Sequence, residues 1–297
     1  MPVKSGNLER MQTIHNATWA GCWALGLALA QTCAWAAEPT PAHEPRLRSA
    51  MAIVVDQDTN EVLYEKNADH VSSIASITKL MTAMVTLDSQ LPLDEDLVVT
   101  REDRASGWAN SRLRPGTHLS REQALHVALM SSENHAAHLL GRTYPGGVEA
   151  IVDAMNAKAQ LIGMTDANFA DPTGLSPENR ASAADLVRMV KAAYDYPEIR
   201  YDSVSTDMIV PVGHHTVHYQ NTNHLTSRPD WQIGLQKTGY IAAAGRCLVM
   251  QAAIAGRRVV MVLLDSVGSA SRFADAQRLR DWIKATKGAD TSASATF

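Results

Sequence analysis

The chain has 297 residues, of which 45% are hydrophobic and 20% charged, an ordinary globular composition with enough length to bury a substantial core. Its formal net charge at pH 7 is −4, and it has no basic run and no basic patch interleaved with aromatic residues. These features exclude nucleic acid as an expected partner. We expect one compact unit of two interleaved parts, and not two separate domains.

The N-terminus has the pattern of a secretory signal. Lys4 and Arg10 precede an uncharged stretch over residues 17–37, and Ala34–Ala36 places small residues where a signal peptidase cleaves. We therefore expect residues 1–36 to be removed as a signal peptide during export to the periplasm.

Two alternatives remain for this segment. The uncharged stretch approaches membrane-spanning length, so it could stay as an uncleaved anchor, or the product could be loosely membrane-associated. A lipoprotein is disfavoured, because neither Cys22 nor Cys33 has the small, Leu-led context of a lipid anchor. After cleavage, residues 37–46 would form a Pro-containing linker. Cys247 would be the one remaining cysteine, which excludes an internal disulfide and predicts a buried, inert thiol.

The first folded elements are predicted to be a hairpin and a helix. Residues 50–66 predict two strands with a turn at 56–60. Apolar residues then recur at helical spacing at Ile77, Leu80, Met81, Met84 and Leu87. This pattern predicts a helix over residues 73–88 that starts near Ser72 or Ser73.

Ser76 and Lys79 share one face of this helix, because residues three apart are neighbours. A serine hydroxyl is a weak nucleophile until a base removes its proton, and a charged lysine cannot do so. The pKa of Lys79 must therefore be lowered by desolvation or by a second cation, for which Lys237 is the candidate. Taken alone, a Ser and a Lys at this spacing also arise often by chance.

A second motif, Ser132–Asn134, lies between helices predicted at about Arg121–Met130 and Asn134–Arg142. Polar side chains in such a connection can point into a cleft. Ser132 could relay a proton to a leaving group, and the Asn134 amide could bind a substrate carbonyl. The alternative is a helix cap, since both residue types are favoured there.

A third motif, Lys237–Gly239, lies in a strand predicted at about 234–241, and apolar strands follow at 247–255 and 258–265. Gly239 would let a ligand or a backbone approach closely, and a substrate could pair with the edge of this strand. The alternative is an ordinary strand glycine.

These elements predict an α+β fold with an antiparallel sheet flanked by helices. The folded domain would span 47–287, with an all-helical part at about 88–196 inserted in the sheet part. A closing helix is expected at 269–284, and the short polar tail 288–297 is expected to be disordered.

Other residues tempt a functional interpretation that we do not adopt. Four histidines, His214, His215, His218 and His224, lie in or just after a hairpin-like run and lack a His-Glu-x-x-His frame. We therefore expect no metal and no cofactor. Packing explains Met81, Met84, Trp108 and Trp231 more simply than a cofactor site does.

Counted together, the three motifs resemble those of class A β-lactamases and penicillin-binding proteins. More narrowly, the chain resembles the low-molecular-mass D-alanyl-D-alanine carboxypeptidases and endopeptidases over about Arg48 to Lys287. The segments that carry the resemblance are Ile74–Thr82, Met130–Asn134, Asp171–Ser176 and Lys237–Tyr240. The Ser-Glu-Asn and Lys-Thr-Gly-Tyr-Ile forms are closest to the D,D-endopeptidase branch typified by penicillin-binding protein 7. The resemblance implies a serine β-lactamase/D,D-peptidase-like fold.

The resemblance also implies the catalytic roles. Ser76 would be the acylated nucleophile and Lys79 its base. Ser132 and Lys237 would pass the proton on to the leaving amine. Glu133 receives no catalytic role and bears only on the choice of branch.

The binding roles follow in the same way. Asn134 would hold the substrate amide, Thr238 would receive its carboxylate, and Gly239 would line the same strand edge. The oxyanion hole would be the backbone N–H groups of Ser76 and Tyr240. The loop Asp171–Asn179 would border the site, without a counterpart of the glutamate that deacylates class A β-lactamases.

The predicted function is thus an exported serine D,D-peptidase that cuts D-Ala-containing bonds in peptidoglycan stem peptides. D-Ala–meso-diaminopimelate cross-links are the preferred target, β-lactam antibiotics are the expected inhibitors, and other cell-wall enzymes are candidate partners. A D-Ala-D-Ala carboxypeptidase, a β-lactamase and a non-catalytic penicillin-binding sensor remain as alternatives. The absent deacylating glutamate argues against the second, and the intact motifs argue against the third.

Overall fold

The computed structural model describes residues 43–104, 111–213 and 215–294. The predicted signal peptide, Trp108 and His214 lie outside the described residues. The described residues form one compact unit. Within the part of the chain that the structure describes, no helix combines the length and the apolar character needed to cross a membrane.

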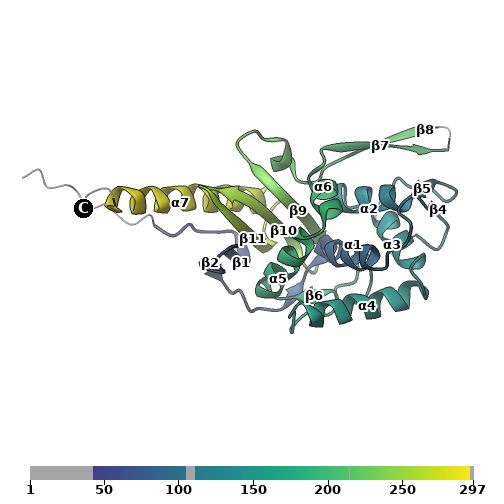
Figure 1. Cartoon of the computed structure of the whole chain (residues 1–297), viewed down its shortest axis with the longest axis horizontal. Coiled ribbons are helices and arrows are strands. Elements are labelled where there is room, and N and C mark those ends of the chain that lie inside the picture. Colours follow the sequence, from purple (N-terminus) through teal and green to yellow (C-terminus); the bar gives the residue numbers. More distant parts are fainter. Residues whose placement is uncertain (1–42, 105–110, 214, 295–297) are drawn as a thin grey trace, which may run out of the picture. The chain divides into compact units, whose positions relative to one another are not determined.

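A five-stranded antiparallel sheet lies at the centre of this unit, in the order β2-β1-β11-β10-β9 (Figure 1). Its strands are β1 (Ser49–Asp56), β2 (Val62–Lys66), β9 (Gln232–Ile241), β10 (Gly245–Ile254) and β11 (Arg257–Ser266). The predicted N-terminal hairpin and the three late strands are therefore confirmed. Strand β9 is an edge strand, and it packs against the turn η1 (Ala75–Thr78), which carries Ser76.

Most helices lie between the two groups of strands along the chain. They are α1 (Lys79–Asp88), α2 (Arg121–Met130), α3 (Asn134–Arg142), α4 (Gly147–Leu161), α5 (Ala183–Tyr194) and α6 (Pro197–Val204). The bounds predicted for α2 and α3 are confirmed. Helix α2 starts where it does because Ser120 and Gln123 form a capping box, in which each side chain accepts from the other residue's backbone N–H.

The inserted part is not all-helical as predicted. It contains the strand pair β4 (Asp96–Val98) with β5 (His118–Ser120), and β6 (Arg180–Ala181), which pairs with β3 (Ser72–Ser73). Strands of two or three residues are too short to produce an alternating pattern, so the sequence did not reveal them. Beyond α6, β7 (Asp207–Val212) and β8 (His215–Gln220) form the hairpin expected for the histidine-containing run, and the turn η2 (His224–Ser227) follows.

The sheet separates two apolar cores, because alternate side chains of one strand point to opposite faces. On one face, Ile53, Val249 and Val262 pack with the helices of the inserted part. On the other, Val54, Leu248 and other strand residues pack against α7 (Ser271–Ser294). Figure 1 shows α7 along one side of the sheet and α5 on the other. Met81 and Met84 lie in the first core and Trp231 in the second, as predicted.

Two predicted helix bounds were wrong. The helix predicted to start near Ser72 or Ser73 starts later, because both residues pair with β6 and Ala75 then takes the left-handed conformation at φ +48°. A 3₁₀ turn precedes α1. At the C-terminus, α7 continues past the predicted end at 284 to Ser294, so most of the tail predicted to be disordered is helical.

Candidate active site

Ser76 and Lys79 meet at the junction of η1 and α1. Both are buried, Ser76 with 8% and Lys79 with 1% of its surface exposed. The Lys79 Nζ lies 2.9 Å from Ser76 Oγ, 2.8 Å from Asn134 Oδ1 and 2.6 Å from the carbonyl oxygen of Thr173. Of these three partners only the hydroxyl carries a proton. A neutral amine can therefore take a proton from Ser76 while it donates to the other two.

The electrostatics of the site favour that neutral amine. Burial lowers the pKa of Lys79 to about 7, although the negative charges of Asp171 and Glu133 oppose the shift. Desolvation is therefore the main cause, as one of the two sequence-based explanations proposed. At neutral pH a large fraction of Lys79 can act as a base, which an ordinary lysine with a pKa near 10.5 cannot do.

Two glycines allow the backbone around Ser76 to pack tightly. A Cβ at Gly174 would lie 2.1 Å from the Ala75 carbonyl oxygen. A Cβ at Gly239 would lie 2.9 Å from the Ile74 carbonyl oxygen and 3.2 Å from the Ser76 nitrogen. A side chain at Gly239 would push the nucleophile turn away from strand β9, and one at Gly174 would push it away from the loop Asp171–Asn179. Gly239 thus has the close-approach role that the sequence suggested.

The second motif and the third meet in a second buried contact. The Lys237 Nζ donates to Ser132 Oγ at 2.9 Å and to the Thr238 carbonyl oxygen at 2.9 Å. Burial lowers the pKa of Lys237, and the positive charges of Lys79 and Arg272 lower it further. Ser132 itself lies in the left-handed region at φ +61°, a conformation that costs a serine free energy and must be held by its surroundings.

Glu133, which follows Ser132, anchors the start of α3, a role that the sequence analysis missed. It is the N-cap of α3, and its carboxylate accepts from the backbone N–H groups of His135 at 2.6 Å and Ala136 at 3.2 Å. It also accepts from the Ser111 hydroxyl. Asn134 follows as the first residue of α3 and directs its side chain to Lys79. The cap interpretation of Ser132 and Asn134 was therefore wrong, because the residue between them caps the helix.

Beside Lys237, the side chain of Thr238 contacts Thr222, with 2.6 Å between the two hydroxyl oxygens. Arg272, at the start of α7, is 7% exposed. Burial, followed by the charge of Arg246, lowers the Arg272 pKa to about 10. Neither Thr222 nor Arg272 stood out in the sequence, because no motif surrounds them. Thr222 reaches Thr238 through a tertiary contact, and the charge of Arg272 acts on the neighbouring Lys237.

The loop Asp171–Asn179 borders the site, as predicted. The Asp171 carboxylate accepts from the backbone N–H groups of Thr173, Gly174 and Ser176 and from the Asn179 side chain. Although burial raises the pKa of Asp171, these hydrogen bonds together with that of the Thr173 hydroxyl lower it overall. The loop is thereby held in one shape, with the Thr173 carbonyl directed at Lys79.

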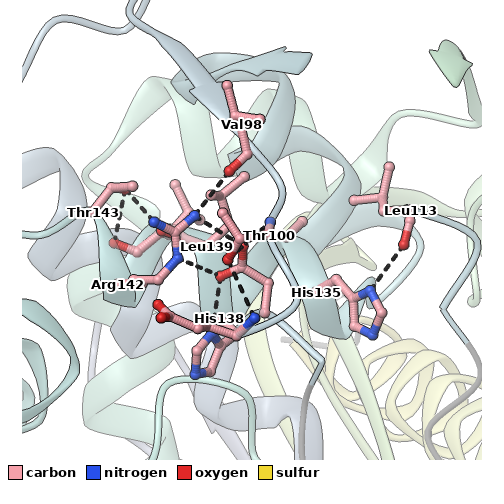
Figure 2. A network of polar contacts seen from close by, with 12 residues as sticks. Val98, Thr100, Leu113, His135, His138, Leu139, Arg142 and Thr143 are labelled. Carbon is pink, nitrogen blue, oxygen red and sulfur yellow. Dashed lines mark hydrogen bonds and ion pairs between the residues drawn. The ribbon is translucent and has the colours of Figure 1, made fainter. Parts of the chain in front are cut away.

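A second buried ionic group lies two turns further along α3. Asp103 is fully buried and accepts from His138 Nδ1 at 3.0 Å, Arg142 Nε at 2.9 Å and Nη2 at 2.9 Å, and the Thr100 backbone N–H at 2.7 Å. Figure 2 shows His138, Arg142 and Thr100 converging at this position. Although burial raises the pKa of Asp103, the hydrogen bonds of His138 and Arg142 bring it well below its usual range. We call this group the Asp103 cluster.

The structure also describes Cys247 and most of the acidic and histidine side chains. Cys247 is fully buried, as predicted, and burial raises its pKa to about 11, which disfavours the reactive thiolate. Within residues 43–104, 111–213 and 215–294, no group of three or more His, Cys, Asp or Glu side chains is arranged to hold a metal ion.

The geometry brings Ser76, Lys79, Ser132, Asn134, Lys237, Thr238 and Gly239 into one site. The site has a buried serine beside a lysine of lowered pKa, with a second serine–lysine pair nearby. These are the groups that an acyl-transfer enzyme with a serine nucleophile requires.

Comparison with known proteins identifies the family. Residues 38–268 match the family described as D-alanyl-D-alanine carboxypeptidase. The chain is 44% identical over 261 residues to a D-alanyl-D-alanine endopeptidase of Escherichia coli, covering 86% of this chain and 84% of that relative. It is 45% identical over 267 residues to one of Pseudomonas aeruginosa, covering 88% and 86%. The chain therefore belongs to the D-alanyl-D-alanine carboxypeptidase family of serine peptidases.

Solved structures agree. A D-alanyl-D-alanine carboxypeptidase of Mycobacterium tuberculosis superposes with a TM-score of 0.75 at 28% identity, covering 83% of this chain and 95% of that one. The Streptomyces K15 DD-transpeptidase has the same fold, with a TM-score of 0.74 at 24% identity over 80% of this chain and 98% of its own. The predicted serine β-lactamase/D,D-peptidase-like fold is confirmed.

Proposed function

We propose that this chain is a peptidoglycan D,D-endopeptidase that opens cross-links between D-Ala and the D-centre of meso-diaminopimelate. The observation that carries the proposal is the 2.9 Å contact of Lys79 Nζ with Ser76 Oγ, together with the Lys79 pKa of about 7. The endopeptidase choice is supported by the names of the Escherichia coli and Pseudomonas aeruginosa relatives. The family description favours a second candidate, a D-Ala-D-Ala carboxypeptidase.

Acylation would proceed by transfer of the Ser76 hydroxyl proton to the neutral Lys79 amine as Oγ attacks the D-Ala carbonyl carbon. When the tetrahedral intermediate collapses, the C–N bond breaks and the leaving amine takes a proton through Ser132 and Lys237, which are in contact at 2.9 Å. Water then hydrolyses the ester, releases the donor peptide and restores Ser76.

The other site residues would bind the substrate. The backbone N–H groups of Ser76 and Tyr240 would form the oxyanion hole, and Asn134 would hold the amide of the donor. Thr238, in contact with Thr222, would receive the carboxylate of the leaving group. The buried positive charge of Arg272 favours an anion at that position.

A penicillin tests the covalent step, because its strained amide resembles the scissile bond. We expect an adduct on Ser76 that persists, since Asp171 and Glu133, whose charges reach Lys79, are both occupied by backbone N–H donors. Ser76→Ala should abolish the adduct. Ser131→Ala is the matched control, because within the described part of the chain that hydroxyl bonds the carbonyl of Val127 and no group of the site. Peptide mass spectrometry that located the adduct on another residue would overturn the assignment.

The scissile bond requires a separate experiment. A terminal D-Ala-D-Ala and a D-Ala–meso-diaminopimelate cross-link both have a D-residue carbonyl, a scissile amide and a carboxylate beside the leaving nitrogen. We expect the purified enzyme to convert cross-linked muropeptide dimers to monomers faster than it trims monomeric pentapeptides. Chromatography of both digests measures this. Rapid loss of terminal D-Ala with intact dimers would make the enzyme a carboxypeptidase.

We also propose that the chain is exported across the inner membrane. Peptidoglycan lies outside the inner membrane, where other enzymes act on the same polymer, so the substrate requires the chain to cross that membrane. The pattern of Lys4, Arg10 and Ala34–Ala36 supports cleavage after Ala36 to give a periplasmic product. The mass of the native protein tests this, and a mass that includes residues 1–36 would support a retained anchor instead.

A further inference from the structure

The proposed function sets the direction of the substrate along strand β9. The leaving-group carboxylate lies at Thr238, and the scissile carbonyl oxygen lies at the N–H of Tyr240. The acyl donor must therefore continue in the same direction along the strand, past Tyr240 toward Ile241 and the start of β10. Side chains near that end of β9 are positioned to contact the donor stem and not the leaving group.

Tyr240 and Arg246 occupy that position. They are directly opposite each other in the antiparallel pair of β9 and β10, so their side chains share one face of the sheet. The Arg246 Cζ lies 4.4 Å from the centroid of the Tyr240 ring. Tyr240 is 56% exposed, an unusual exposure for an aromatic residue of a central motif, and Arg246 is half-buried. The ring orders the guanidinium and removes water from one of its faces.

Arg246 differs from other arginines of the same sheet in having no acidic partner. Arg257 pairs with Glu61, and Arg258 pairs with Asp58. Among the residues that the structure describes, no carboxylate lies within ion-pair distance of Arg246, and its contact is with the Tyr240 ring. The positive charge of Arg246 helps to lower the pKa of buried Arg272. The guanidinium beside Tyr240 is therefore ordered by the ring and has no direct ion-pair partner among the described residues.

We propose, on the basis of the proposed function, that Arg246 binds a carboxylate of the acyl-donor stem, on the residue that precedes the D-Ala. In a meso-diaminopimelate stem this is the carboxylate of the D-centre. A planar guanidinium with one face on an aromatic ring keeps its N–H edge free for bidentate binding of a carboxylate. Arg246 is thus a specificity residue on the donor side, whereas Thr238 and Arg272 serve the leaving-group side.

The test uses two synthetic cross-linked dimers that differ only in this group, one with the free carboxylate and one with the carboxamide. For the unsubstituted enzyme we expect a higher kcat/KM on the carboxylate dimer. Arg246→Gln should lower that value about fivefold to tenfold, chiefly through KM, and should abolish the preference between the two dimers. Arg258→Gln, which removes an exposed arginine from the neighbouring strand, is the matched control and should retain the preference.

Acylation of Ser76 by a penicillin with an uncharged side chain is the second measurement. We expect Arg246→Gln to acylate at a rate within about twofold of the unsubstituted enzyme, because the penicillin carboxylate occupies the Thr238 side. An equal loss on both dimers, or a similar loss of penicillin acylation, would overturn the donor-side assignment. An enzyme that reacts with penicillin but cleaves neither dimer would refute both the proposed function and the subsite. Cleavage of both dimers without a preference would refute the subsite alone.

Discussion

The active site and the Asp103 cluster both bury charged groups against helix α3, but they balance those charges in opposite ways. In the Asp103 cluster, one buried carboxylate receives hydrogen bonds from His138, Arg142 and a backbone N–H. In the active site, the ammonium groups of Lys79 and Lys237 are buried beside hydroxyl, amide and carbonyl oxygens.

The pKa shifts record this difference. Hydrogen bonds to the charged form keep Asp103 ionised despite its burial, so the cluster stays charged at any physiological pH. None of the described carboxylates is bonded directly to Lys79, and burial brings its pKa to about 7. A buried charge with matched partners fixes structure, whereas a buried charge without them becomes a group that exchanges its proton at neutral pH.

Replacing Lys79 in the active site should have the largest effect, and the quantity affected is the rate of acylation. In Lys79→Met the side-chain volume is nearly kept but the base is lost, so we expect penicillin acylation of Ser76 to fall by about 10²–10⁴-fold. Stopped-flow labelling measures the rate, and circular dichroism checks that the fold persists. Near-normal acylation by a folded Lys79→Met protein would mean that another group takes the proton.

Removing the carboxylate of the Asp103 cluster should lower the stability of the fold. Asp103→Ala leaves Arg142 and His138 without their buried partner, so we expect a loss of about 3 kcal/mol in the free energy of unfolding. Urea denaturation measures it, and folded protein should still acylate Ser76 within about threefold of the original rate. Asp96→Ala, which breaks an exposed pair with His118, is the control and should change stability little.

A strong loss of acylation in Asp103→Ala with little change in stability would contradict a purely structural role for the Asp103 cluster. It would mean that the Asp103 cluster positions the reacting groups, and not only α3.

The pH dependence of the original protein should separate the two regions further. Between the Lys79 pKa of about 7 in the folded state and its ordinary value near 10.5, the unfolded chain binds more protons at this residue. Its contribution therefore makes the protein more stable as pH rises, by at most about 1.4 kcal/mol per pH unit. Lys237, whose pKa is also lowered, acts in the same direction.

The measurement is a series of urea denaturation curves from pH 7 to pH 9. The slope of stability against pH should be smaller in Lys79→Met than in the original protein. An unchanged slope would show that Lys79 titrates with an ordinary pKa.

Glu133 has a structural and an electrostatic role. It caps α3, and its negative charge raises the pKa of Lys79. Acylation should increase with pH through about 7 as Lys79 loses its proton. Glu133→Gln keeps an acceptor oxygen but removes the charge that raises the Lys79 pKa, so the increase should shift to lower pH. A pH–rate profile measures the shift.

Ser182→Ala removes an ordinary helix cap on α5 and is the matched control, which should leave the profile in place. A profile that does not move in Glu133→Gln, with unchanged acylation at high pH, would limit Glu133 to a structural role.

Much of the fold and the core of the site could be predicted because the signals are local. Apolar spacing and end residues predicted the bounds of α2 and α3, and apolar runs bounded by glycine predicted β10 and β11. The resemblance of three short motifs then identified Ser76, Lys79, Ser132 and Lys237 as one set, which the structure places in two contacting pairs. The start of α1 was misplaced because pairing between Ser72 and Ala181 is not visible in local spacing.

The sequence by itself determined which residues could do the chemistry, since a serine, a lysine and a carboxamide are properties of single positions. Only the tertiary structure decided whether they can react. Lys79 is suited to act as a base because Asn134 and Thr173, 55 and 94 positions away, enclose it, and no carboxylate of the described residues pairs with it. The proposed role of Arg246 likewise depends on the fold, which sets its guanidinium on the Tyr240 ring with no described carboxylate within ion-pair distance. Desolvation and charge pairing depend on distances between atoms, and segments remote in sequence acquire those distances only when the chain folds.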